Sequence, residues 1–357
     1  MTNPKNLPDI FNGDEWSRSL NYIGLTRGFS HLAFHNNDLL LVSSEKSGEY
    51  DRYNYAYGID LRFWSPFSNQ ISENGHALSL SSDSSGIIST AIIKDDNRFQ
   101  FAVTQSPVSN YWTEIKFYDI PEQYKTTIDL THSRSRFLAD THFFLYTGFF
   151  FYSLRGEWIC VPLDHPFNTA KIIDVAYFNN NFFFLLKQNN NYTLLYTSDC
   201  ESFKSLQLIW PGVTVNSIST NQNQLVVVGS EDNEKKCVIL YTEIATTNEW
   251  HKISFTPLGL EVDHYCSLYD LLSYQNVWYI VGSTHTFKNK FKFSVKGLTY
   301  KIEGNISRNN PILMETNPAT NLKRVYVDQN KSIIYAIGES RPTGDYFVTC
   351  RKLNNGS

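Results

Sequence analysis

Charged residues are scarce in this chain of 357 residues, of which only 18% are Asp, Glu, Lys or Arg. Lysine and arginine form no run, and the formal net charge is −4. A surface that holds nucleic acid or an anionic membrane needs a basic patch, so neither partner is indicated. Long hydrophobic runs are missing too: residues 141–154 are the most apolar segment, and they fall short of the roughly 18 residues of a membrane span.

Cysteine is sparse and scattered, with Cys160, Cys200, Cys237, Cys266 and Cys350 far apart and no Cys-x-x-Cys. This odd set predicts reduced, buried thiols rather than a disulfide framework or a metal site. Residues 1–6 lack the apolar stretch of a signal peptide, so we expect synthesis in a cytoplasm.

Familiar catalytic motifs are also missing. The chain has no Gly-x-Ser-x-Gly elbow, no phosphate-binding glycine loop and no His-Glu-x-x-His. We therefore expect no catalytic residues, no metal and no cofactor, and we favour a protein that is not an enzyme. Extended amphipathic helical patterns are missing as well, which leaves strands as the main regular structure.

What is abundant is aromatic: 25 Phe and 22 Tyr bring the aromatic share to 15%, which suits half-buried strands. An Asn-rich turn followed by an apolar run recurs along the chain. The turns are residues 35–38, 179–181, 221–224, 274–276 and 328–331, followed by runs at 39–43, 182–186, 225–230, 277–283 and 332–338. Asn and Asp tolerate the positive φ that tight hairpins require, and the apolar runs suit strands buried on both faces.

Adjacent copies lie roughly 45–55 residues apart, the length that four short strands and their turns need. Two less regular units fit at residues 76–121 and 127–164. The pattern predicts an all-β fold, a single β-propeller of seven four-stranded blades, with six or eight blades left open.

The two ends of the chain suggest how the ring closes. Glu157-Trp158 and Glu249-Trp250 each open a fourth strand, and Glu15-Trp16 has the same form. The last blade, by contrast, stops near Leu353 after three strands. We therefore expect residues 14–26 to complete the last blade, with an arm at 1–13, the propeller at 14–353 and a tail at 354–357. The alternative is that Glu-Trp recurs by chance and the N-terminal segment is a loose arm.

One hairpin carries a family resemblance. Thr197-Ser198-Asp199-Cys200-Glu201-Ser202-Phe203 resembles a degenerate Asp-box, the Ser/Thr-x-Asp-x-Gly-x-x-Trp motif of sialidase-like (BNR-type) propellers. It departs from that motif because Glu201 replaces the glycine and the spacing is one residue short. The resemblance implies that Asp199 caps the turn and Phe203 packs beneath it. It implies the propeller fold rather than an activity.

Candidate ligand-binding residues lie between the second and third strands of the first blade, where Tyr50, Arg52, Tyr53 and Tyr55 are interleaved with other polar residues. Such rings stack on sugars or anchor a protein partner, although an edge strand with alternating Tyr gives the same pattern. Longer insertions between second and third strands of later blades add His285, Arg341 and Asp345 on the same expected face.

A second candidate is the short basic stretch of residues 132–136, which contains Arg134 and Arg136. We interpret it as a polar loop, either a solvated turn or a contact to a phosphate or carboxylate.

The leading hypothesis is a non-enzymatic binding or scaffold propeller that holds a protein or glycan on its ring face, in an oligomeric state that stays open. The Asn-, Phe- and Tyr-rich texture suits a bacteriophage tail or another virion component. One alternative is a divergent sialidase-like glycoside hydrolase or a lyase. A hydrolase needs two carboxyl groups roughly 5–10 Å apart in the central funnel, facing arginine or tyrosine. Another alternative is a bacterial assembly factor.

Overall fold

The structure of the chain is a computed structural model. The residues that the structure describes are 17–18, 29–35, 38–43, 55–60, 63–64, 75–94, 98–105, 112–119, 124, 134–154, 156–208, 210–231, 233, 235–247, 249–257, 264–287, 293–318, 320–340 and 346–353.

Within this described part, the strands form seven four-stranded antiparallel sheets. The first three sheets in chain order are β2 (Phe29–His35), β3 (Asp38–Ser43), β4 (Tyr55–Asp60) and β5 (Phe63–Trp64); β6 (Gly75–Ser82), β7 (Ile88–Lys94), β8 (Arg98–Thr104) and β9 (Thr113–Asp119); and β10 (Arg134–Leu138), β11 (Thr141–Leu145), β12 (Phe149–Leu154) and β13 (Glu157–Pro162).

The next three are β14 (Lys171–Phe178), β15 (Asn181–Gln188), β16 (Asn191–Thr197) and β17 (Lys204–Leu208); β18 (Val213–Thr220), β19 (Leu225–Glu231), β20 (Cys237–Thr242) and β21 (His251–Phe255); and β22 (His264–Tyr274), β23 (Val277–Phe287), β24 (Phe293–Glu303) and β25 (Ile312–Pro318). The last sheet joins β26 (Thr320–Asp328), β27 (Ile333–Ser340) and β28 (Tyr346–Lys352) to β1 (Ser17–Arg18).

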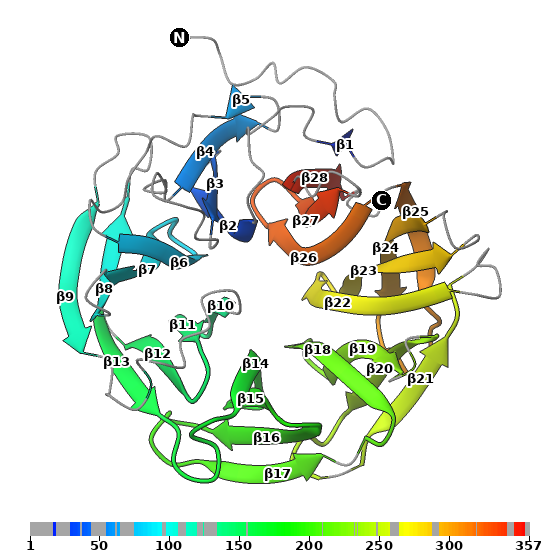
Figure 1. The fold of residues 1–357 in the computed structure, drawn as a ribbon, viewed down its shortest axis with the longest axis horizontal. Coiled ribbons are helices and arrows are strands. Elements are labelled where there is room, and N and C mark those ends of the chain that lie inside the picture. The colour runs from blue at the N-terminus through cyan, green and yellow to red at the C-terminus, as the bar shows by residue number, and fades with distance from the viewer. Residues whose placement is uncertain are drawn as a thin grey trace.

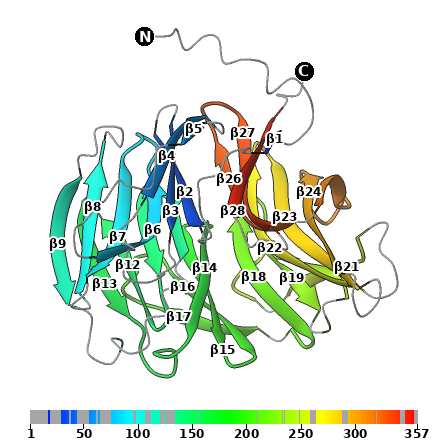
Figure 2. The same ribbon diagram turned by 45° about the horizontal axis from the view of Figure 1, so that its top comes forward.

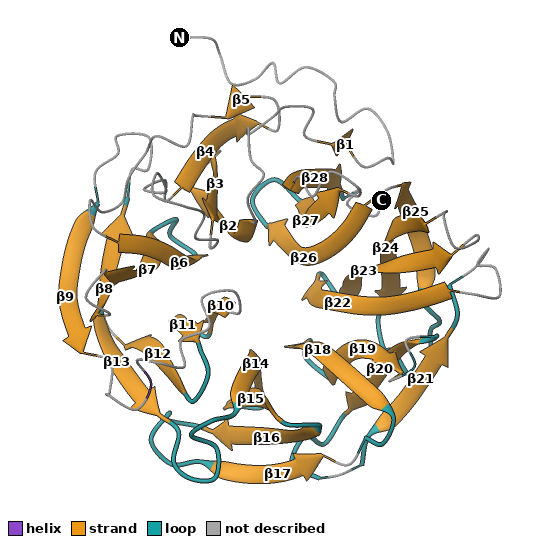
Figure 3. Ribbon diagram, viewed as in Figure 1, coloured by secondary structure: helices purple, strands orange, loops and turns teal. Residues whose placement is uncertain are grey.

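These sheets stand around one central axis, with the first strand of each nearest the axis and the fourth at the rim (Figure 1). The predicted all-β single propeller is confirmed. The described residues contain no α-helix (Figure 3), and hence none that could cross a membrane.

The ring closes through its two ends. Strand β1 pairs antiparallel with β28, with Ser17 opposite Cys350 and Arg18 opposite Thr349, and the two strands lie side by side in Figure 2. This confirms that the N-terminal segment completes the last sheet, and the alternative of a loose arm is wrong. The segments 1–13 and 354–357 lie outside the described residues, so the outer limits of the domain stay a prediction.

The core consists of apolar clusters that fill the wedges between neighbouring sheets. In the wedge between the second and third sheets, Phe101 stacks on Trp158 with ring centroids 4.2 Å apart, and Phe99, Phe149 and Phe151 surround them. Because neighbouring sheets splay apart toward the rim, large rings fill the widening gap better than aliphatic side chains. This packing explains why the sequence is so rich in aromatic residues.

The hairpin turns have the conformation that their sequence predicts. Asn179 and Asn180, which join β14 to β15, have φ angles of 47° and 60°. Gln275 and Asn276, which join β22 to β23, have φ angles of 50° and 61°. Left-handed backbone is the geometry that closes a two-residue hairpin.

Candidate functional site

The candidate site lies on the axis, and β-bulges in the innermost strands build it. In six of the described innermost strands the register slips once. The slips lie between Phe29 and His31, Ala77 and Ser79, Ile172 and Asp174, Val215 and Ser217, Leu268 and Asp270, and Leu322 and Arg324. A bulge inserts one extra residue and re-aims the side chain that follows it. The residue after each bulge is polar: His31, Ser79, Asp174, Ser217, Asp270 and Arg324.

Strand β10 contributes to the same layer without a bulge. Arg134 precedes its hairpin turn (Ala139 and Asp140) by five residues, as Asp174 precedes the turn at Asn179. Arg136 lies two residues further along the strand. Two arginines of β10 thus lie near the axis with one aspartate of β14 and one of β22, so three sheets contribute charged side chains.

Asp174 is clamped by both arginines. Nε and Nη2 of Arg134 donate to its two carboxylate oxygens at 3.1 and 2.7 Å, and the same atoms of Arg136 donate at 2.9 and 2.8 Å. The Asp174 carboxylate also accepts from the backbone N–H groups of Val175 (3.0 Å) and Ile218 (3.3 Å). Bidentate arginine–carboxylate pairs of this kind fix geometry as well as charge.

Asp270 joins the same cluster from the opposite side of the axis. Its Oδ1 accepts from Nη2 of Arg134 and, at 3.1 Å, from Nη2 of Arg136. Its Oδ2 accepts from the backbone N–H of Val325 at 3.1 Å. The hydroxyl of Ser217 lies 2.7 Å from Asp174 Oδ2 and 2.8 Å from Asp270 Oδ1, so it bridges the two carboxylates.

The charges of this ion cluster, defined as Arg134, Arg136, Asp174 and Asp270, compensate one another. Burial alone would raise the pKa of Asp174, but the two guanidinium groups outweigh it and hold this pKa well below its usual range. Burial disfavours the cationic form of Arg136, and the two aspartates more than offset that and raise its pKa. Asp174 and Arg136 therefore stabilise each other in their charged forms.

His31 lies in the same layer as an uncharged group. Its side chain is 1% exposed, and burial, aided by the positive charges of Arg134 and Arg136, lowers its pKa to about 3. The side chain of Tyr326 in β26 makes a hydrogen bond with the backbone of Leu32. Burial raises the pKa of the Tyr326 hydroxyl. Both groups are neutral near pH 7.

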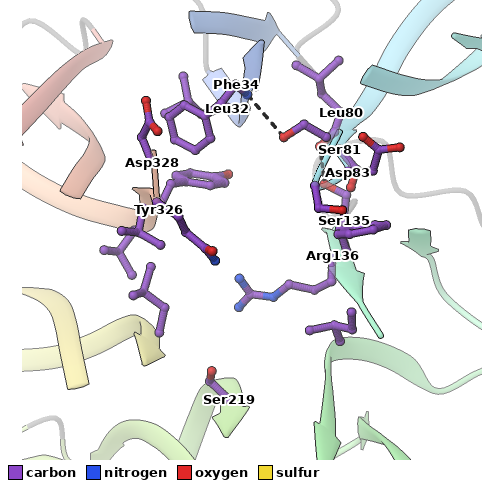
Figure 4. A pocket seen from close by; sticks show the side chains of 18 of the residues that line it. Leu32, Phe34, Leu80, Ser81, Asp83, Ser135, Arg136, Ser219, Tyr326 and Asp328 are labelled. Atoms are coloured by element: carbon purple, nitrogen blue, oxygen red, sulfur yellow. Dashed lines mark hydrogen bonds between the residues drawn. The ribbon is translucent and has the colours of Figure 1, made fainter. Parts of the chain in front are cut away.

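Above the ion cluster the channel widens into a funnel of about 640 Å³. Its wall takes residues from all seven described innermost strands, and small side chains such as Ser81, Ala176 and Ser219 leave the space open. Figure 4 shows the guanidinium of Arg136 extended into the middle of the opening, toward Tyr326. Arg136 is 17% exposed, whereas Arg134 and the two aspartates are 3% exposed or less.

The funnel opens on the face that carries the turns between first and second strands. Its rim includes residues 83–86 of the β6–β7 turn and residues 328–330 of the β26–β27 turn. The sequence predicted a site at the insertions between second and third strands. In an antiparallel sheet those insertions leave from the opposite end of the second strand, and therefore from the opposite face of the ring.

The basic stretch of residues 132–136 is not a loop where it is described. Arg134 and Arg136 lie in strand β10 at the axis, buried and half-buried, so the interpretation as a solvated turn is wrong. The stretch resembles a loop in sequence because its residues do not alternate between apolar and polar. A strand that faces the channel does not need that alternation when its polar side chains pair with other polar side chains. Both arginines instead contact carboxylates of the protein itself, those of Asp174 and Asp270.

Most of the other predicted ligand-binding residues lie outside the described part. Tyr50, Arg52, Tyr53, Arg341 and Asp345 are not described, and Tyr55 is described only as the first residue of β4.

His285 is described, and it does not lie in an insertion. It lies within β23, opposite Tyr265 and Val295, with its Nε2 3.2 Å from the Ser283 hydroxyl. The insertion prediction is wrong here because β23 runs on to Phe287.

The turn before β17 has the contacts expected of Asp199 and Phe203. Oδ1 of Asp199 accepts from the backbone N–H groups of Glu201 and Ser202 at 2.9 and 3.0 Å, and from the Thr197 hydroxyl at 2.8 Å. Phe203 packs against the cluster between the third and fourth sheets. The turn joins β16 to β17, the two outer strands of their sheet, and none of its residues lines the funnel.

The aspartates are sealed beneath the funnel floor, and their oxygens are engaged by arginines and backbone N–H groups. Among the described residues, no three His, Cys, Asp or Glu side chains gather as metal ligands would. The funnel therefore offers a shaped wall of hydroxyl and apolar groups, with the Arg136 guanidinium reaching into the opening above the buried aspartates.

Sequence analysis missed His31, Asp174, Ser217, Asp270 and Tyr326. Aligning the Asn-turn copies would have found most of them, because His31, Asp174 and Asp270 each precede their turn by five residues. A polar residue at one fixed place in otherwise apolar strands is the signal of a side chain that faces the axis.

Comparison with known proteins adds the fold and no more. No family model matches the chain, and no curated protein sequence matches it. The structure is similar to selenomethionine-substituted virginiamycin B lyase from Staphylococcus aureus (TM-score 0.58, 11% identity, 95% of this chain and 99% of that one). It is similar to YCF48 bound to D1 peptide (0.56, 8%, 96% and 96%) and to the Dos1 propeller (0.55, 12%, 95% and 96%). At such identities the likeness is one of fold alone, and by that measure this chain is a β-propeller.

Proposed function

We propose that this propeller is a non-enzymatic binding module that holds a segment of a partner protein in its central funnel. The observation that carries the proposal is the funnel itself. It encloses about 640 Å³, within the range of about 300–1,000 Å³ of ligand pockets, and every described innermost strand contributes to its wall.

The chemistry of the wall suits a peptide. Hydroxyl groups of Ser81, Ser219 and Ser273 alternate with apolar groups such as Phe34 and Leu272. An extended chain presents carbonyl and N–H groups together with apolar side chains, so it can use both kinds of wall. Among solved propellers with a similar fold, YCF48 has been captured with a peptide, which supports this choice of ligand.

The glycoside hydrolase alternative has some basis, because Asp174 and Asp270 lie together at the axis beside arginines and Tyr326. A glycosidase needs one carboxyl group with a raised pKa to act as the acid, however, and the pKa of Asp174 is lowered. Both carboxylates are also shielded from the funnel, with exposures of 0 and 1%. We therefore assign the cluster a structural role as the floor of the site.

A random library of twelve-residue peptides, panned against the full-length protein, tests the proposal. We expect recovered peptides to bind the protein in a fluorescence titration and to lose that binding in the Ser219→Trp variant, which fills the funnel. Ser205→Trp is the matched control, because Ser205 is exposed on the outer strand β17. Failure to recover any binding peptide, or equal binding by both variants, would overturn the proposal.

Enzyme activity is tested separately. A panel of chromogenic glycosides should show no turnover above that of a denatured sample. Turnover that disappears in Asp174→Asn, in a variant shown to be folded, would favour the hydrolase. A virion or phage-tail setting rests on composition only, because no described contact bears on it.

A further inference from the structure

A second cavity adjoins the funnel on the same face. It is a groove of about 620 Å³ that crosses the hairpin turns of three consecutive sheets, those that begin with β14, β18 and β22. The residues that line it are Tyr177, Phe178, Asn179, Thr220, Asn221, Gln222, Ser273, Gln275 and Asn276. We name this cavity the carboxamide groove, because five of the nine are Asn or Gln.

Turn geometry accounts for the asparagines of the groove. Asn179 and Asn276 have positive φ angles of 47° and 61°, which Asn adopts more readily than most residues. The Oδ1 of Asn221 accepts from the backbone N–H groups of Asn223 and Gln224 at 2.9 and 2.8 Å, so Asn221 folds its own turn.

Turn geometry does not account for the glutamines. The side chain of Gln222 is exposed and makes no hydrogen bond to any described residue. Gln275 has a positive φ, where Asn or Gly fits better, and its Nε2 donates to the Tyr274 hydroxyl at 3.2 Å. Gln329 occupies the corresponding turn after β26, at the rim of the funnel. Three long carboxamides therefore lie at equivalent turns on this face, and the Gln222 side chain makes no hydrogen bond that would hold its own turn.

The groove offers hydrogen bonds without charge. None of the described residues that line it is Asp, Glu, Lys, Arg or His, and each carboxamide can both donate and accept. A charged ligand would lose water here without gaining an opposite charge.

The groove and the funnel are continuous, because Thr220 and Ser273 line both. We propose that the carboxamide groove holds an uncharged continuation of the bound peptide, rich in Asn, Gln, Ser or Thr, whose anchor occupies the funnel. This inference rests on the proposed function. It specifies which residue types the bound peptide carries, which the funnel alone does not.

The test uses the peptides recovered from the random library on the full-length protein. We expect Asn, Gln, Ser and Thr to be enriched over Asp, Glu, Lys and Arg at one end of these peptides. Replacing the enriched Asn and Gln by Asp and Glu in a resynthesised peptide should weaken binding about tenfold or more. Gln222→Ala should weaken binding about threefold to tenfold, the loss of one or two uncharged hydrogen bonds.

Gln207→Ala is the matched control, since Gln207 is an exposed glutamine on the outer strand β17, and it should leave binding unchanged. Peptides that need Ser219 but show no preference for uncharged residues and no response to Gln222→Ala would overturn this inference and leave the proposed function standing. If instead an array of neutral glycans binds through Gln222 and no peptide does, both fall.

Discussion

Arg134 of β10 and Asp270 of β22 are 136 residues apart in the chain and form an ion pair at the centre of the ring. The same carboxylate accepts from the backbone N–H of Val325 in β26. The Asp270 side chain therefore connects three sheets that share no hairpin. The floor of the funnel forms only when these three sheets stand at the right distance from one another.

Removing the positive charge of Arg134 should be costly. We expect Arg134→Met to lower the free energy of unfolding by about 3–5 kcal/mol, because Arg136 alone then faces two buried carboxylates and one negative charge is left uncompensated. Denaturant unfolding followed by tryptophan fluorescence measures this loss. Lys204→Met, at an exposed position of β17, is the control and should change stability by less than about 0.5 kcal/mol. An equally small change for Arg134→Met would contradict the structural role of the cluster.

Stability should depend on pH through two buried histidines. Burial lowers the pKa of His31 to about 3 and that of His142 to about 4, whereas an unfolded histidine titrates near 6.5. Between these values the unfolded chain binds more protons. Their contribution is therefore complete above about pH 6.5 and is lost as the pH falls toward 4, by up to about 1.4 kcal/mol per pH unit for each histidine.

Asp174 acts in a lower window. Its pKa is depressed in the folded state, so its contribution is present above the unfolded value near 3.9 and is lost only as the pH falls below it. The range from pH 6.5 to 4 thus reports on the histidines. His142→Gln should flatten the slope there by about half, and the exposed His251→Gln should not. An unchanged slope in His142→Gln would contradict the burial of a neutral histidine.

Two glycines in second strands should be intolerant of any side chain. A Cβ on Gly229 would lie 1.9 Å from the Thr214 carbonyl oxygen, and one on Gly282 would lie 2.2 Å from that of Ser267. Each glycine faces the bulge of its own sheet, which presses the neighbouring backbone against it. We expect Gly229→Ala to cost about 2–4 kcal/mol, measured by denaturant unfolding.

The control for this substitution is Gly212→Asn. Gly212 has a φ of 73° and open space around its Cα, and Asn tolerates that backbone. It should cost less than about 1 kcal/mol. If Gly229→Ala is as mild, the close approach of the two backbones is not a constraint.

The five cysteines, all free, should be unreactive in the folded protein. Burial raises the pKa of Cys160, Cys200 and Cys350 to about 12, and a hydrogen bond with Cys266 together with burial raises that of Cys237. Because the thiolate is the reactive form, labelling by a maleimide at a pH of about 8 should be at least about a hundredfold slower than in denaturant. A thiol labelled at the rate of free cysteine would contradict this packing.

The sequence predicted the ring but not the site. Asn turns and apolar runs are local signals, so they place strands such as β15 and β19 from neighbouring residues alone. The site depends on contacts between strands far apart, such as Asp174 with Arg134, and on one-residue bulges that decide which side chain faces the axis. Within one strand, the polar residue after a bulge looks the same as one that faces solvent, and only its fixed distance from the turn in several copies separates the two.

The sequence also did not predict which face of the ring carries the funnel, for a related reason. Insertion lengths identify the long loops, but the channel opens where the innermost side chains are small. Ser81, Ala176 and Ser219 line the funnel, and each lies two residues past the residue that follows the bulge of its strand. That pattern becomes visible only when the strands are set around a common axis.

The pairing of β1 with β28 has a consequence for how the molecule is made and handled. The first strand leaves the ribosome without its partner, which is synthesised almost a whole chain later, so the last sheet cannot be completed during most of translation. For the same reason β1 and β28 act as one structural element. A change in either strand bears on the same few hydrogen bonds, and with them on the closure of the ring.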